Sequence, residues 1–250
     1  MPTDAPVCPP DHYQAVLVEG PDAASFLQGQ LTQEVLTLAA GSVRRAALLT
    51  PQGRVLATPW VTAGEGGLAL LVPAPLATAV HERLRRYVLR SRARLALAPP
   101  APATLALLAA TLAADGGAAS DWMLALIRAG AAEVGATTSE EWIPQMLNLD
   151  LTGAINFQKG CYTGQEIVAR TQHLGRIKRR MFRLRAQAGP PQPKAALLAG
   201  GLKAGEVVLS AATPAGCELL AVVNLDARGA PLTLEGGAAC EWADLPYPVP

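Results

Sequence analysis

The chain has 250 residues, enough for one large domain or two to three small ones around a sizeable core. Half of the residues are apolar and 16% are charged, which argues against an intrinsically disordered chain. Lysine and arginine together number 21 against 20 acidic residues, so the chain is neither a histone-like polycation nor an acidic solvating tail. Any basic surface must be local.

The start of the chain, residues 1–10, lacks a basic region followed by an apolar core and predicts no secretory signal. The longest run without a charge, residues 95–114, is interrupted by prolines, which leaves an apolar piece shorter than the roughly 20 residues of a membrane helix. We therefore expect a cytoplasmic protein that does not engage a membrane. The cysteines are Cys8, Cys161, Cys217 and Cys240. Their wide spacing predicts neither a metal site nor a disulfide framework.

The first half of the chain alternates strand and helix patterns. Thr50-Pro51-Gln52-Gly53 has proline and glycine at the positions that a type I turn prefers, and apolar runs on both sides predict a hairpin. After a glycine-rich turn at 64–67, apolar residues recur every four positions, which is the period of a helix. We expect strands at 46–49, 55–61, 68–72 and 94–98, and a helix from Leu76 to Val88.

The end of the chain has a different pattern. A proline-rich stretch at 186–193 predicts a linker, which divides the chain into regions 1–185 and 186–250. Beyond it, short apolar runs alternate with turns and show no helical period, which predicts a small all-β domain. The chain has no regular βαβ alternation and no G-x-G-x-x-G motif after a strand. The fold class expected is α+β, not a Rossmann fold.

The segment 156–170 combines a thiol, a cation and two glycines with a predicted helix start. Thr163 and Glu166 have the spacing of a capping box, which places the helix N-terminus just after Cys161. The positive end of the helix dipole, together with Lys159, predicts a lowered pKa and a reactive thiol at Cys161. The ordinary alternative is a small, buried, apolar cysteine.

The motif Lys159-Gly-Cys-Tyr-Thr-Gly-Gln-Glu166 resembles the signature of the YgfZ family, folate-binding proteins related to the glycine-cleavage T protein. The resemblance includes Phe26-Leu-Gln-Gly-Gln-Leu-Thr32 and extends over most of residues 11–182. It implies a ring-like fold of the glycine-cleavage T type, with two intertwined mixed α/β lobes and a small C-terminal β-barrel. It also implies a central channel that holds tetrahydrofolate or a derivative.

The function that the resemblance implies is support for the assembly or repair of iron–sulphur clusters in client enzymes, including enzymes that modify tRNA. The expected partners are folate and iron–sulphur client or assembly proteins. The reactive pair would be Cys161, activated by Lys159. The cofactor-binding residues would be Trp122, Tyr13, Tyr162, Gln165, Glu166 and Arg170. Ordinary core packing is the alternative for Trp122 and Tyr13, since aromatic residues make up only 4% of the chain.

A folate-dependent aminomethyl or methyl transferase is the alternative function. The aminomethyltransferase has paired acidic residues after the hairpin turn, whereas the aligned positions here are Ala57 and Thr58. Glu34, Glu133 or Asp150 would have to supply the acid. We therefore expect no turnover by the chain alone.

Two short stretches, 83–94 and 170–185, hold thirteen of the 21 cationic residues. Such clusters can bind phosphates, a polyglutamate tail or RNA, or can simply be a solvated helix face. In the first stretch Tyr87 is the only aromatic residue among the cations, which does not favour direct binding of nucleic acid.

Overall fold

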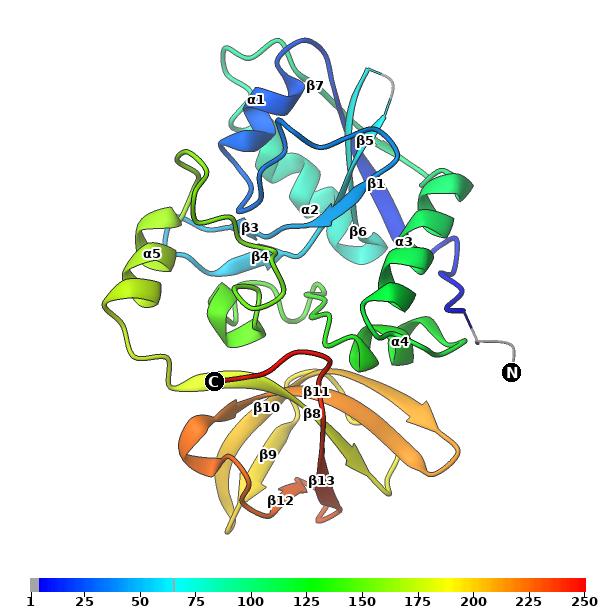
Figure 1. The fold of residues 1–250 in the computed structure, drawn as a ribbon, viewed down its shortest axis with the longest axis vertical. Helices are drawn as coiled ribbons and strands as arrows, with labels where there is room; N and C mark the ends of the chain where they lie inside the picture. The colour runs from blue at the N-terminus through cyan, green and yellow to red at the C-terminus, as the bar shows by residue number, and fades with distance from the viewer. Residues whose placement is uncertain (1–4, 65) are drawn as a thin grey trace.

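The computed structural model describes residues 5–64 and 66–250 and consists of an α+β part followed by a β-barrel (Figure 1). A five-stranded antiparallel sheet with the order β2-β5-β6-β1-β7 forms the centre of the α+β part. Its strands are β1 (Tyr13–Glu19), β2 (Val43–Arg45), β5 (Trp60–Gly64), β6 (Gly67–Pro73) and β7 (Arg94–Ala98).

The two faces of this sheet have different partners. Helices α1 (Ala23–Gln28) and α2 (Ala74–Arg85) pack with Val16 and Val18 on one face. Tyr13 and Trp60 belong to the opposite face, because successive side chains of a strand alternate, and they join a larger core. The expected helix is confirmed, but it ends before Val88.

The remaining elements of the α+β part are short. The hairpin of β3 (Leu48–Leu49) and β4 (Val55–Ala57) confirms the predicted turn, in which the Gly53 amide donates to the Thr50 carbonyl at 2.9 Å. The other elements are α3 (Pro102–Ala114), α4 (Trp122–Arg128), the 3₁₀ helix η1 (Pro144–Leu147) and α5 (Gln165–His173).

A closed six-stranded barrel with the order β10-β11-β8-β13-β12-β9 ends the chain and confirms the predicted all-β region. Its elements are β8 (Arg179–Ala186), β9 (Ala196–Ala199), β10 (Leu202–Thr213), β11 (Gly216–Asn224), η2 (Leu225–Ala227), β12 (Leu232–Leu234) and β13 (Ala239–Ala243). The boundary expected at residue 186 is wrong. Strand β8 pairs with β11 and β13, so the barrel begins at Arg179, and the prolines of 186–193 lie in a loop inside the barrel.

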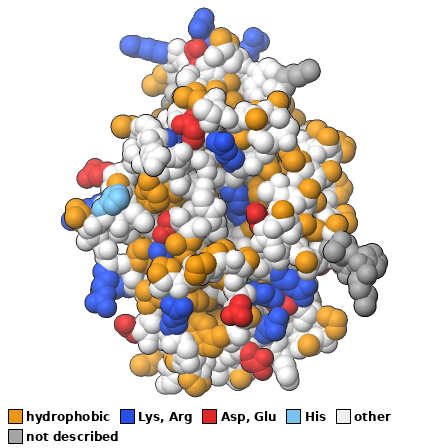
Figure 2. Space-filling view, viewed as in Figure 1, with side chains coloured by type: hydrophobic (Ala, Val, Ile, Leu, Met, Phe, Trp, Pro, Cys, Tyr) orange, Lys and Arg blue, Asp and Glu red, His pale blue; other side chains and the backbone are white. Residues whose placement is uncertain are grey.

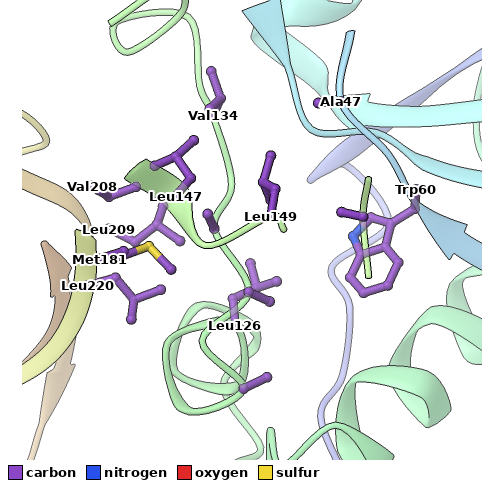
Figure 3. Close-up of a cluster of buried hydrophobic side chains, with 14 of the residues drawn as sticks. Ala47, Trp60, Leu126, Val134, Leu147, Leu149, Met181, Val208, Leu209 and Leu220 are labelled. Atoms are coloured by element: carbon purple, nitrogen blue, oxygen red, sulfur yellow. The ribbon is translucent and has the colours of Figure 1, made fainter. Parts of the chain in front are cut away.

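The two parts share one hydrophobic core (Figure 3). Met181 and Leu220 of the barrel lie on the same side of this cluster as Leu147 of η1, and Leu126 of α4 lies between them and Trp60. This continuous packing holds the barrel against the α+β part. Among the described residues, no helix has the length and apolar character needed to span a membrane.

Candidate functional site

A pocket of about 510 Å³ lies where the sheet, helix α3 and the chain after the barrel come together. Cavities of roughly 300–1,000 Å³ are typical of small-molecule and cofactor sites. The sheet contributes Arg44, Arg45 and Trp60, the end of α3 contributes Asp115, and the C-terminal segment contributes Tyr247. We call this cavity the central pocket.

Arg45 is the most constrained cation of the central pocket. Its guanidinium lies over the Trp60 ring, 4.7 Å from the ring centre, and donates a hydrogen bond to the Ala132 carbonyl. Its Nε is buried and has no hydrogen-bond partner among residues 5–64 and 66–250. Burial lowers the pKa of Arg45 below its usual value, although an arginine of this kind stays charged. Burial also raises the pKa of Asp115, against the opposing effect of the Arg45 charge.

A buried hydrogen-bond network stands behind Trp60. The Tyr13 hydroxyl accepts the indole N–H groups of Trp60 and Trp122, each at 3.3 Å, and donates to Glu133. The other Glu133 oxygen lies 2.8 Å from His12 Nε2. Burial, followed by the Glu133 charge, raises the pKa of Tyr13 well above its usual value.

The network includes the two aromatic residues predicted to contact folate. Tyr13 and Trp122 are buried in the core and do not line the central pocket. The aromatic residues that do line it are Trp60 and Tyr247, both of which sequence reasoning missed. Tyr13 and Trp122 instead hold the position of the Trp60 indole through the shared hydroxyl.

The Lys159 side chain is held by backbone carbonyls of a distant loop. Its ammonium donates to the backbone carbonyls of Gln28, Leu31 and Gln33 at 2.7, 2.6 and 2.9 Å. Three donors meet three acceptors, so the ammonium is fully used in joining the signature motif to the 26–34 loop. Burial lowers the pKa of Lys159 to about 8, against a smaller opposing effect from Glu34. The ammonium is thus engaged by three carbonyls, and the activation of the Cys161 thiol by Lys159 stays a prediction.

Cys161 is exposed in the loop that precedes α5, in contrast to the buried Cys8, Cys217 and Cys240. The predicted capping box is not formed: α5 begins at Gln165, its N-cap is Gly164 in the left-handed region (φ 82°), and no side chain caps it. A Cβ on Gly164 would lie 2.6 Å from the Thr50 carbonyl oxygen. The close contact between Gly164 and the hairpin turn therefore requires a residue without a side chain at this position.

The other predicted cofactor-binding residues lie outside the central pocket. Tyr162 is buried in the core beneath the Lys159 ammonium, whose Nζ is 5.2 Å from the ring centre. Gln165 starts α5, and Glu166 and Arg170 are exposed on it. The described residues that line the pocket include none of the four. A long motif in the sequence therefore marks a structural junction with an exposed thiol.

The three acids named for transfer chemistry are engaged elsewhere. Glu34 accepts from Gln28, Glu133 is held by the Tyr13 network, and Asp150 pairs with Arg180. Among the described residues that line the central pocket, Asp115 is the only carboxylate. No sequence pattern around Asp115 indicated this position.

Sequence comparison places the chain in a known family. A protein of Haemophilus influenzae described as uncharacterized is 31% identical over 200 residues, which cover 70% of this chain and 71% of that protein. The tRNA-modifying protein YgfZ of Klebsiella pneumoniae is 29% identical over 231 residues, which cover 71% of each chain. The chain belongs to the YgfZ family. Its likeness to the YgfZ protein of Colwellia psychrerythraea is higher but local, at 49% over 72 residues, or 29% of this chain and 22% of that protein.

The fold of this YgfZ-family chain is that of the glycine-cleavage T proteins. The aminomethyltransferase T of Bartonella henselae superposes with a TM-score of 0.71 at 18% identity, covering 95% of this chain and 84% of that one. This confirms the fold class predicted from the signature. A scan against protein-family models finds no match.

Proposed function

We propose that this YgfZ-family chain binds tetrahydrofolate or a derivative in the central pocket. The observation that carries the proposal is the place and lining of that pocket, where Arg44, Arg45, Asp115 and Trp60 converge at the junction of the two parts. A folate has a flat ring with an amino group and ring N–H donors at one end and glutamate carboxylates at the other. The pocket offers a complementary group for each.

The residues present fit such a ligand. Asp115 can accept from the amino and ring N–H groups, and the two arginines can pair with the glutamate carboxylates. The buried Arg45 Nε without a partner is a donor that a ligand oxygen would satisfy. Trp60 contributes an apolar wall whose orientation the Tyr13 hydroxyl fixes. When bound, the folate supplies one-carbon carrier chemistry, whereas the chain's own residues bind and orient it.

We further propose that the chain supports iron–sulphur cluster assembly or repair in client enzymes, including enzymes that modify tRNA. The support is family membership, the similarity to relatives named tRNA-modifying proteins, and the exposed Cys161 thiol. One exposed thiol is too few for a cluster site of four thiolates. Any cluster ligation through Cys161 therefore needs thiols from a client, a second copy or a small molecule.

Calorimetry with tetrahydrofolate under reducing conditions tests the first proposal. We expect the wild-type chain to bind and Asp115→Asn or Arg45→Gln to weaken binding, on the order of tenfold for the loss of a charged hydrogen bond. Asp226→Asn is the matched control, since Asp226 is exposed in η2 of the barrel and does not line the pocket. Absence of binding to the wild type would refute the proposal.

Cys161→Ala separates the two proposals. We expect this variant to bind tetrahydrofolate normally but to lose support of cluster-containing clients in cells that lack the endogenous protein. Full support by the variant would remove the thiol from the function. Turnover of methylene or methyl folate with an amine or thiol acceptor would favour the alternative transferase instead.

A further inference from the structure

The end of the molecule opposite the barrel has an unusual charge distribution. Residues 83–94, here called the basic tip, contain six of the 21 cationic residues and none of the 20 acidic ones. They form the last turn of α2, the loop after it and the start of β7, at the top of Figure 1. Lysine or arginine side chains project from the same end in Figure 2. The chain is nearly neutral overall, so this surface is locally cationic.

Most of these arginines have no ion-pair partner within the described chain. Arg85, Arg86, Arg90 and Arg94 are exposed and form no salt bridge with a described residue. The one ion pair that the tip forms with a described residue joins Arg92 to Asp22. Free guanidinium groups on one short segment bind carboxylates well, because each can form two parallel hydrogen bonds.

A large apolar side chain stands among these charges. Leu89 is 88% exposed, the highest value among the exposed large hydrophobic residues. Its neighbour Tyr87 is only 38% exposed and lies beneath Arg83, with the guanidinium 5.0 Å from the ring centre. An exposed leucine next to arginines is typical of a protein-binding surface in which one apolar side chain packs against the partner and the charges around it pair with the partner's charges.

The loop that presents Leu89 is anchored at both ends. At its start, the amides of Tyr87 and Val88 donate to carbonyls of the last turn of α2. At its end, the Arg92 amide donates to the Asp22 carboxylate at 2.7 Å. The Arg92 carbonyl oxygen also packs against Gly20, where an added Cβ would lie only 2.3 Å from that oxygen. A loop held in this way loses little conformational freedom on binding.

We propose that the basic tip is a docking surface for an acidic segment of a partner protein, with Leu89 as its apolar anchor. The arginines pair with carboxylates of the segment, and Leu89 packs against an apolar residue between them. A single-stranded nucleic acid fits less well, because base stacking needs a free aromatic face and Arg83 covers the ring of Tyr87. The surface is separate from the central pocket, so the two sites can be tested independently.

The test measures fluorescence anisotropy of a labelled peptide of glutamates around one central leucine, and of the same peptide with serine in place of the leucine. We expect the wild-type chain to bind the leucine peptide more tightly, with affinity that falls as salt is added. Arg86→Glu with Arg90→Glu should weaken binding by about tenfold or more. Leu89→Ser should weaken binding of the leucine peptide by about tenfold and leave the serine peptide unchanged.

Arg176→Glu with Lys178→Glu is the control of equal charge change, since both residues are exposed but lie after α5. Circular dichroism checks that every variant is folded. An equal loss in this control would show general electrostatic attraction and overturn the proposal. It is also overturned if Leu89→Ser has no effect, if the leucine peptide does not bind, or if oligouridylate or phosphatidylserine vesicles bind the tip more tightly than the peptide.

Discussion

Arg180 and Asp150 form a two-pronged ion pair in the interior, with Nη1–Oδ1 and Nη2–Oδ2 distances of 2.6 and 2.9 Å. Their side chains are 4% and 1% exposed. Arg180 belongs to β8 and also donates to the Gln145 carbonyl of η1 at 2.9 Å. One charged contact thus ties the first barrel strand to the α+β part.

Breaking this pair should strongly destabilise the chain. Asp150→Asn leaves the Arg180 guanidinium buried without a counter-charge, and we expect a loss of about 3–5 kcal/mol in the free energy of unfolding, measured with urea. The control, Glu206→Gln, breaks a pair whose lysine, Lys203, is 57% exposed, and should cost less than about 1 kcal/mol. Equal losses would show that the buried pair contributes no more than a surface one.

Lys159→Met tests the junction between the signature motif and the 26–34 loop. The three carbonyls that accept from the ammonium lose their donor, and we expect a loss of about 3 kcal/mol at neutral pH. Lys178→Met, at an exposed position, should leave stability unchanged within about 0.5 kcal/mol. A small effect of Lys159→Met would mean that the ammonium does not hold the junction.

The same lysine gives a pH dependence with a definite sign. Burial lowers its pKa from 10.5 to about 8, so between these values the unfolded chain binds a proton that the folded chain does not. The contribution of Lys159 to stability therefore rises with pH across this window and falls as pH drops to 8. We expect the stability difference between wild type and Lys159→Met to widen from pH 8 to 10.5. A difference that narrows would contradict the lowered pKa.

Local chemistry made part of the fold predictable. The hairpin at Thr50–Gly53 depends on residues within the turn itself, and the strands of the barrel depend on short apolar runs. The prolines of 186–193 led to a misplaced domain boundary, because a loop between two barrel strands and a linker between domains can have the same composition. Only the pairing of β8 with β11 and β13 shows which it is.

The site was less predictable because distant segments build it. Arg45, Asp115 and Tyr247 meet in the central pocket without any local pattern that connects them. Lys159 lies two positions from Cys161, which suggested a direct effect on the thiol, but its ammonium contacts carbonyls such as that of Leu31. Spacing along a loop does not show the direction in which a long side chain turns.

Tyr13→Phe tests the network behind the pocket. The change removes the hydroxyl group, whose oxygen accepts from Trp60 and Trp122 and whose O–H donates to Glu133, and it leaves buried polar groups without partners. We expect a loss of about 2–3 kcal/mol in unfolding free energy and a change in tryptophan fluorescence. Tyr87→Phe, at a half-exposed ring, should change neither. Unchanged fluorescence in Tyr13→Phe would mean that the hydroxyl does not orient the indoles.

Alkylation distinguishes the four thiols. Burial raises the pKa of Cys8 to about 12 and of Cys240 to about 11, and Cys217 is also buried with a raised pKa, whereas Cys161 is exposed. Because the thiolate is the reactive form, iodoacetamide should modify only Cys161 in the folded chain and all four thiols in urea. Mass spectrometry counts the adducts. Any adduct on the folded Cys161→Ala variant would contradict the burial of the other three thiols.

Gly164→Ala tests the contact that sets the start of α5. Gly164 has a φ of 82°, and an added Cβ would lie 2.6 Å from the Thr50 carbonyl oxygen. Gly153 is a matched control, with a φ of 70° and nothing within 4 Å of an added Cβ.

Both substitutions carry the cost of a left-handed alanine, about 1–2 kcal/mol, but only Gly164→Ala must also push the hairpin turn away, at a further cost of about 1–3 kcal/mol. Thermal unfolding should therefore show a clearly lower midpoint for Gly164→Ala than for Gly153→Ala. Equal midpoints would mean that the hairpin and α5 do not pack as closely as the structure shows, and that Gly164 is required only for its backbone conformation.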